Sequence, residues 1–176
     1  MKNIFYNSDS THSFIDYGIQ IPLLNERIAQ TVMALNLKSN FISEITEKDL
    51  LLAHTKDFVD RIYTDPIALV EETYELINPD GSFNRYHPQT ATKSLVEFIE
   101  KAKIHIGGTY LTAKNSLDTG FSYHLGGGMH HSMSMRPGGF CMFNDIVIAI
   151  RKLQQEGLVT VSYTHLRAHE TRHDLV

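Results

Sequence analysis

Cysteine is almost absent from this sequence, because Cys141 is the one cysteine in a chain of 176 residues. A single cysteine excludes an internal disulfide and suits a reducing compartment, so we expect a cytoplasmic protein. Long apolar runs are also missing. No stretch approaches the roughly 20 apolar residues that a membrane helix needs, and the N-terminal residues include no apolar stretch of signal-peptide length.

Charge of one sign is not in excess either. The formal net charge is −4 and the isoelectric point is about 6.2. This balance favours neither direct binding to nucleic acid nor binding to an anionic membrane. We find no internal repeats and no low-complexity linker. The hydrophobic content of 42% is enough for one globular domain with a buried core.

The chain does contain an alternation of strand-like and helical segments. A strand is expected at 2–7, a turn at 78–82, a strand entering a glycine loop at 120–131, and helices at 25–36, within 46–64, at 92–106 and at 144–158. The apolar residues expected to face the core on the last two helices are Leu95, Phe98, Ile99, Ala102, Ile106, Ile146, Ala149, Ile150 and Leu153. Another strand is expected after Leu158. This order predicts an α/β fold with a mostly parallel sheet flanked by helices.

The segment 126–145 has the composition of a site at the carboxyl end of a strand. The glycines at 126–128 allow the backbone to approach another group closely, and His130 and His131 follow almost directly. Two imidazoles with differently tuned pKa values could divide proton transfer between them. The alternatives are a structural histidine pair and a buried Cys141 rather than a nucleophile. The glycine run lacks the Lys-Ser/Thr ending of a phosphate-binding loop.

The whole string "GGGMHHSMSMRPGGFCMFNDIVIAI" resembles the signature of the zinc-dependent histone deacetylase family, which includes acetoin-utilisation and acetylpolyamine amidohydrolase proteins. The shared pattern is a glycine run, a His-His pair, Gly-Phe-Cys, and Asn-Asp at the start of a helix. The segments 54–63 and 107–117 are similar to other parts of the family more loosely. The resemblance covers about 1–159 and implies the N-terminal part of an arginase/deacetylase-type fold, truncated relative to the family.

The resemblance also implies roles for particular residues. His130 would be the general base that activates a zinc-bound water, and His131 the acid or electrostatic partner. Gly139 and Phe140 would line the narrow tunnel that holds an acetyl-lysine or a small acetylated amine. Protein lysine, acetylpolyamine and small amides all fit the motif. Ser132 stands where the family usually has alanine, a small change that we expect to be tolerated.

The family's metal ligands are not evident in this chain. The expected Asp-x-Asp-x-His segment does not follow the helix at 144–158, so we expect no zinc ligands here and predict an inactive fragment of a longer, active deacetylase. Residues 160–176 back-translate into DNA that resembles a sequencing-library adapter, so we expect a deacetylase part at 1–159 and a non-native tail at 160–176. The tail carries histidines at helical spacing, which we do not expect to form a zinc site: His165, His169 and His173.

Two other functions stay open at this point. The related arginase-type ureohydrolases share the α/β architecture but use two manganese ions and a different pattern of histidine and aspartate. The Gly-Phe-Cys and Asn-Asp elements argue against them. The second alternative is a non-catalytic remnant that retains part of the fold. The sequence leaves the oligomeric state open.

Overall fold

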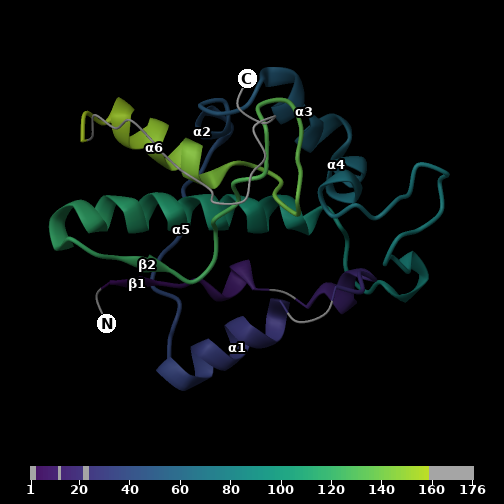
Figure 1. The fold of residues 1–176 in the computed structure, drawn as a ribbon, viewed down its shortest axis with the longest axis horizontal. Helices are drawn as coiled ribbons and strands as arrows, with labels where there is room; N and C mark the ends of the chain where they lie inside the picture. The colour runs from purple at the N-terminus through teal and green to yellow at the C-terminus, as the bar shows by residue number, and fades with distance from the viewer. Residues whose placement is uncertain (1–2, 12, 22–23, 159–176) are drawn as a thin grey trace, which may run out of the picture.

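The structure is a computed structural model that describes residues 3–11, 13–21 and 24–158. Within them, one small parallel sheet lies beside the longest helix (Figure 1). The strands are β1 (Ile4–Phe5) and β2 (Tyr123–His124), the α-helices are α1 (Leu24–Leu35), α2 (Glu47–Leu50), α3 (Lys56–Thr64), α4 (Pro66–Thr73), α5 (Glu97–Thr119) and α6 (Asp145–Gln155), and the 3-10 helices are η1 (Ser8–Ser10), η2 (Phe14–Tyr17) and η3 (Pro88–Thr90). Ile4 pairs with Tyr123 and Phe5 with His124. The parallel pairing agrees with the expected α/β class.

Helix α5 forms the centre of the described part of the chain. Figure 1 shows α6 along one side of α5, the β1–β2 pair along the other, and α1 beyond the pair. The large apolar side chains around α5 exclude water and stabilise the fold by burial. The largest fully buried side chains of the core include Tyr17, Ile19, Leu50, Phe58, Leu69, Leu76, Phe98, Ile106, Phe143 and Ile148.

Helix α5 differs from the expected helix at 92–106, because it starts later and continues through a pair of glycines. A Cβ on Gly107 would lie 2.3 Å from the Oγ of Ser43, and one on Gly108 would lie 2.2 Å from Nε2 of His124. The glycines therefore serve close packing and do not end the helix. The five residues of the predicted apolar stripe are all buried: Leu95, Phe98, Ile99, Ala102 and Ile106.

Helix α6 begins as expected, since the Asn144 Oδ1 accepts a hydrogen bond from the Val147 N–H at 3.1 Å. Its inward face is partly different from the expected one. The buried residues are Asp145, Ile148, Ala149 and Leu153. Ile146 and Ile150 were expected inside but are only half-buried, because α6 turns the face containing Ile148 toward α5. The strand expected after Leu158 lies outside the described residues.

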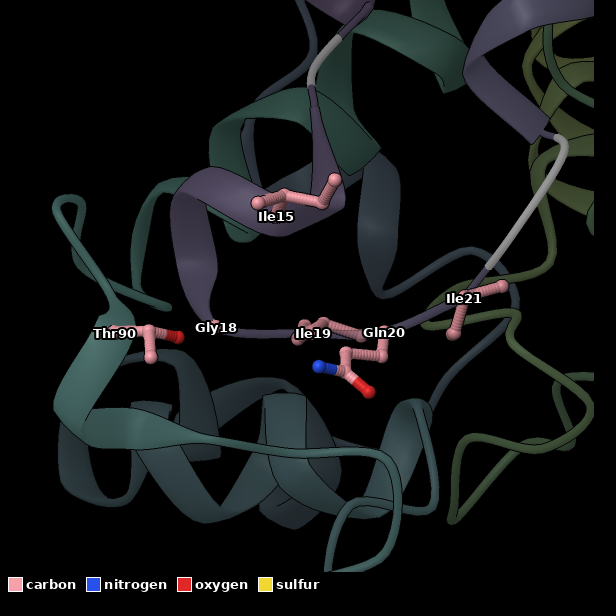
Figure 2. A pocket seen from close by; sticks show the side chains of 6 residues that line it. All are labelled: Ile15, Gly18, Ile19, Gln20, Ile21 and Thr90. Atoms are coloured by element: carbon pink, nitrogen blue, oxygen red, sulfur yellow. The ribbon is translucent and has the colours of Figure 1, made fainter.

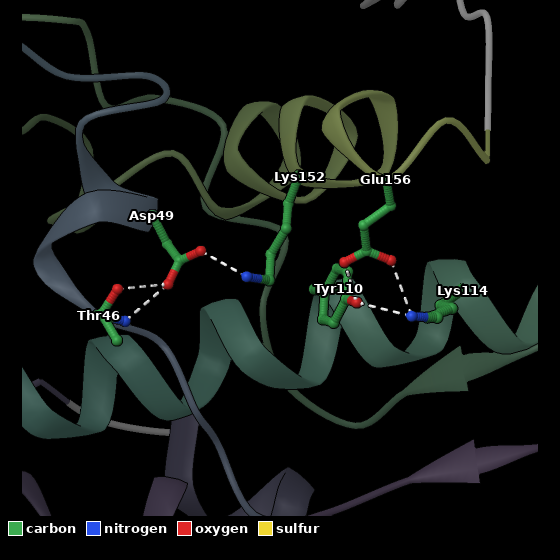
Figure 3. A network of polar contacts seen from close by, with 6 residues as sticks. All are labelled: Thr46, Asp49, Tyr110, Lys114, Lys152 and Glu156. Atoms are coloured by element: carbon green, nitrogen blue, oxygen red, sulfur yellow. Dashed lines mark hydrogen bonds and ion pairs between the residues drawn. The ribbon is translucent and has the colours of Figure 1, made fainter.

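Polar contacts fasten α6 to the elements beside it (Figure 3). The Lys152 ammonium donates to the Asp49 carboxylate on α2 at 2.5 Å. The Glu156 carboxylate, just after α6, accepts from the Tyr110 hydroxyl at 2.5 Å and from Lys114 at 2.8 Å, both on α5. These contacts hold the C-terminal part of α6 against α2 and α5.

The other elements expected from the sequence are present, but some have other lengths than expected. The strand expected at 2–7 is reduced to β1, while the region 46–64 contains two helices, α2 and α3. The Asp49 carboxylate accepts from the Thr46 N–H at 2.8 Å, as expected for a capping residue. The turn at 78–82 is present, with its last carbonyl bonded back to the first N–H at 2.8 Å.

Candidate functional site

The four residues to which the resemblance assigns catalysis or substrate binding line one cavity. His130, His131, Gly139 and Phe140 surround a space of about 370 Å³, together with the glycine run at 126–128. Small-molecule sites have volumes from about 300 Å³ upward. The structure therefore brings all four predicted residues together in a hollow of suitable size.

A larger hollow lies elsewhere, along the segment that follows η2 (Figure 2). Its volume is about 510 Å³, and its lining residues are Ile15, Gly18, Ile19, Gln20, Ile21 and Thr90. Figure 2 shows that these side chains offer an amide and a hydroxyl but no group that titrates near neutral pH. The lining of this hollow therefore offers no side chain for proton transfer near neutral pH.

The glycine run brings the backbone very close to buried side chains. Gly127 has φ +69°, and a Cβ there would lie 2.4 Å from the Thr109 Oγ1 and 2.6 Å from the Asp145 Oδ2. A Cβ on Gly126 would lie 2.7 Å from the His105 Nδ1, which also accepts the Gly127 N–H at 3.1 Å. Only glycine has both the space and the backbone freedom for this path.

The two histidines lie side by side at the end of this run. Their ring centroids are 4.3 Å apart and the rings are tilted by 40°. The Nδ1 of His130 is 2.7 Å from the carbonyl oxygen of Gly128. Because a carbonyl oxygen can only accept, this contact assigns the proton to Nδ1 and the lone pair to Nε2. His130 is therefore held in the tautomer of a proton acceptor at Nε2.

A tight turn at 138–141 carries the other two residues. Gly138 and Cys141 exchange backbone hydrogen bonds of 3.1 and 2.8 Å. Between them, Gly139 and Phe140 both have positive φ, 52° and 63°. A Cβ on Gly139 would lie 2.7 Å from the His131 ring, so the turn depends on glycine there. Phe140 occupies a conformation that costs a bulky residue roughly 1 kcal/mol or more, and such strain is common at ligand sites.

The Phe140 ring is held between two partners. The Tyr74 ring lies 6.2 Å away in a stacked arrangement, and the Arg85 guanidinium lies 5.4 Å from the Phe140 centroid. Arg85 also pairs with Glu75 at 3.5 Å. Burial raises the pKa of the Tyr74 phenol, so it stays protonated. Cys141 is buried beside them, and its thiol contacts the Gly139 carbonyl at 3.5 Å, as expected for a small core residue.

Asp145 connects α6 to the glycine run. Its fully buried carboxylate accepts hydrogen bonds from the N–H of Gly128 at 2.8 Å, the N–H of Met129 at 2.7 Å and the Thr109 hydroxyl at 2.5 Å. Burial raises the pKa of this carboxyl, while the three hydrogen bonds oppose the rise. The sequence indicated only a favourable charge at the start of a helix.

His54, like Asp145, binds two backbone groups of the segment 126–144, and the sequence did not predict this role. It is 5% exposed, its Nδ1 donates to the Met133 carbonyl at 2.9 Å, and its Nε2 accepts the Asn144 N–H at 3.0 Å. Burial lowers the pKa of its imidazole. The segment 54–63 was noted for its family resemblance, but no role followed. Ser132, the departure from the family pattern, is accommodated because its hydroxyl donates to the Met142 carbonyl at 2.9 Å.

A further histidine, half-buried, lies beneath the glycine run. His124 on β2 packs against Gly108, and its Nδ1 lies 3.2 Å from the Thr109 hydroxyl oxygen. Burial, with a smaller contribution from His105, lowers the pKa of His124 to about 3. The ring is therefore neutral at physiological pH and serves packing.

The described residues contain no group of three or more His, Cys, Asp or Glu side chains that could hold a metal ion. The histidines at 165, 169 and 173 lie outside the described residues. No helix among the described residues is long and apolar enough to cross a membrane.

Comparison with protein families decides the assignment. The family described as the histone deacetylase domain matches residues 21–170, most of the chain. This chain belongs to the histone deacetylase family. The assignment confirms the resemblance drawn from the sequence and the expected arginase/deacetylase-type fold. The matched range extends beyond the boundary expected at 159, so that division of the chain stays a prediction.

Two relatives illustrate how this histone deacetylase family member compares. The acetoin utilization protein AcuC of Bacillus subtilis is 30% identical over 131 residues, which are 70% of this chain and 31% of the relative. Histone deacetylase 2 of Arabidopsis thaliana is 32% identical over 108 residues, which are 61% of this chain and 25% of the relative. The chain therefore spans less than a third of the length of these relatives.

Proposed function

We propose that this chain is part of a zinc-dependent deacetylase that, in a longer protein, hydrolyses the amide of an acetyl-lysine or a small acetylated amine. The observation that carries the proposal is the shared cavity of His130, His131, Gly139 and Phe140. Membership of the histone deacetylase family supports the same class of reaction. With a net charge of −4 and one cysteine, we propose a cytoplasmic protein that does not bind nucleic acid directly.

The histidine pair supplies the proton transfers in this proposal. His130, protonated at Nδ1 by its contact with Gly128, accepts a proton at Nε2 from the attacking water. His131 acts as the acid or electrostatic partner and passes a proton to the departing amine. At 4.3 Å between ring centroids, two imidazolium charges would repel each other. The pair therefore favours a single proton that moves from one step to the next.

Gly139 and Phe140 are proposed to hold the substrate chain. Gly139 presents no side chain, so the backbone of the turn at 138–141 can lie against the His131 ring at the wall of the cavity. The Phe140 ring adds an apolar wall, held in place by Tyr74 and Arg85. An acetylated lysine or amine combines an alkyl stem with a neutral amide, and these two surfaces fit that combination.

Zinc does not fit the described residues, since they contain no group of three or more potential ligands. When bound, zinc would polarise the acyl oxygen and activate water, but this chain's described residues contribute no step through it. We expect the 176-residue chain to bind no stoichiometric zinc and to release no acetate from an acetyl-lysine peptide. Metal analysis that finds one tight zinc per chain would contradict this.

The decisive experiment uses the uninterrupted gene read through the position of Val159. We expect its protein to release acetate from an acetyl-lysine peptide, and His130→Ala in that protein to lower turnover by about 10²-fold or more. Thermal melting of the variant serves as the control for folding. Near-normal turnover in a folded variant would remove His130 from the reaction. Manganese dependence of the longer protein would instead favour a ureohydrolase-like reaction, and a lack of any turnover would favour a non-catalytic role.

A further inference from the structure

We propose that Arg85 is a specificity-determining residue beside Phe140, and that it favours substrates with a carboxylate beyond the acetylated amine over substrates with a second amine. This inference rests on the proposed function of the cavity that Phe140 lines. The substrates left open by that function differ in charge at the end of the alkyl chain. An acetylated diamine ends in an ammonium group, whereas an acetylated amino acid or an acidic peptide presents a carboxylate.

The Arg85 side chain brings a positive charge to the wall of the cavity. Its guanidinium lies 5.4 Å from the centroid of the Phe140 ring, a distance that suits attraction between a cation and an aromatic face. Among the described residues that line the cavity there is no Asp, Glu, Lys or Arg. A substrate chain that leaves the cavity past Phe140 therefore comes within reach of the Arg85 charge.

The guanidinium is accessible to a ligand. The Arg85 side chain is 40% exposed and forms a long ion pair with Glu75 at 3.5 Å, and the Glu75 side chain is 59% exposed. Ion pairs between exposed side chains contribute little to stability, so a substrate carboxylate can replace Glu75. Arginine suits this role because its planar fork of N–H donors matches the two oxygens of a carboxylate.

The backbone on both sides of the Arg85 side chain is fixed. The Arg85 carbonyl accepts the Gln20 N–H at 2.8 Å, and the His87 N–H donates to the Gly18 carbonyl at 2.7 Å. These hydrogen bonds involve no side-chain atom. Substitution of Arg85 therefore changes the charge beside Phe140 while the segment that carries it keeps its backbone partners.

The expected discrimination follows from the sign and the exposure of this charge. An exposed pair of opposite charges changes an equilibrium constant by up to about fivefold. A comparison of a carboxylate with an ammonium sets an attraction against a repulsion, so we expect a preference of about tenfold. Salt should reduce it, because the screening length falls from about 10 Å at 0.1 M to about 3 Å at 1 M.

The test measures acetate release by the longer protein from compounds that share one alkyl chain. 6-Acetamidohexanoate ends in a carboxylate, N-acetylcadaverine ends in an ammonium group, and N-pentylacetamide ends in neither. Two acetyl-lysine peptides, with aspartate or with lysine beside the acetyl-lysine, distinguish a protein substrate from a small acid. We expect kcat/KM to favour the carboxylate by about tenfold in at least one of these sets at low salt, and this preference to approach one at 1 M salt.

Variants of Arg85 and of its partner should move this ratio in opposite directions. Arg85→Ala should bring it close to one, Arg85→Glu should reverse it, and Arg85→Lys should keep most of it. Glu75→Gln should raise it by about twofold or more, because it removes the competing carboxylate. Arg151→Ala is the matched control, since Arg151 is exposed on α6 and lines a different hollow, and it should leave the ratio unchanged.

A ratio that stays the same in Arg85→Ala and Arg85→Glu, in a protein that releases acetate, would reject only the role of Arg85. If these variants do not fold, an unchanged ratio in Glu75→Gln would reject that role. Titration calorimetry of the same compounds gives a second readout that needs no catalysis. A carboxylate preference in binding that Arg85→Glu reverses, with no acetate release, would reject the proposed function and leave the role of Arg85 in place. A lack of both binding and release would overturn both.

Discussion

Two regions of the molecule differ in what binds their backbone groups: the loop at 126–144, here called the anchored loop, and the small sheet of β1 and β2. The anchored loop contains one isolated bridge but no helix or strand. Its backbone bonds to the buried side chains of Asp145 and His54. The small sheet has regular pairing but only two residues in each strand, and Tyr123 is 54% exposed.

The difference teaches that regular secondary structure is not what positions the histidine pair. A backbone N–H or carbonyl that leaves water must find a partner, whether in a ladder or on a side chain. In the anchored loop several of these partners are single buried side chains, and Asp145 and His54 each bind two backbone groups. We therefore expect single substitutions to damage the loop far more than comparable ones damage the sheet.

The largest effect on stability is expected from His54→Leu, which keeps the bulk of the ring and its packing against Phe58 and Phe143. The Met133 carbonyl and the Asn144 N–H both lose their partner inside the fold. Each unsatisfied group costs about 1–3 kcal/mol, so we expect a loss of about 3 kcal/mol in the free energy of unfolding, measured by urea denaturation.

Tyr123→Ala on β2 is the matched variant in the other region. Because its side chain is largely exposed, we expect a change within about 0.5 kcal/mol. The comparison between the regions fails if the two variants lose similar stability. It also fails if His54→Leu is nearly neutral, since the loop would then be held by something other than this anchor.

Acid should weaken the molecule through two histidines whose pKa values are lowered in the fold. The pKa values of His54 and His124 are lowered by burial, that of His124 to about 3, whereas an unfolded histidine has a pKa of about 6.5. Unfolding therefore takes up protons below pH 6.5. The stabilising effect of the neutral rings is complete above that pH and is lost as the pH falls toward the folded values.

Between pH 7.5 and 5.5 this uptake amounts to at most about 1.4 kcal/mol for each histidine. Urea denaturation at several pH values measures it, and His54→Leu provides the control because one of the two groups is gone. Its stability should fall less steeply with acid than that of the unmodified chain. Equal slopes would show that the pKa of His54 is the same in the folded and unfolded chain.

The sequence predicted those features that depend on neighbouring residues. The Asn144 cap, the apolar stripe of α5 and the need for glycine at 126–128 all follow from local spacing and backbone freedom. The resemblance named four residues that do line one cavity, although their roles stay predictions. His54 was missed as an anchor because its partner Asn144 lies 90 residues away, and no periodic pattern records such a contact.

The length of the first strand was not predicted because it also depends on a contact with a distant part of the chain. A strand at 2–7 was expected from composition alone, but a strand extends only as far as a neighbour pairs with it. Within the described residues β1 pairs with β2 over two positions. The inward face of α6 was likewise set by its contact with α5, which made Ile148 the buried residue in place of Ile146 and Ile150.

A smaller effect than that of His54→Leu is expected at the one departure from the family pattern inside the anchored loop. Ser132 is 4% exposed, and its hydroxyl donates to the Met142 carbonyl at 2.9 Å. Ser132→Ala restores the residue that the resemblance expects, and removes one neutral hydrogen bond worth about 1 kcal/mol net. The exposed Ser39, bonded to Ser8 at 2.8 and 2.9 Å, is the matched control, and Ser39→Ala should cost less than about 0.5 kcal/mol. If Ser132→Ala loses as much stability as His54→Leu, the single hydroxyl hydrogen bond of Ser132 holds the loop as firmly as His54. A gain in stability would mean that the serine destabilises the loop.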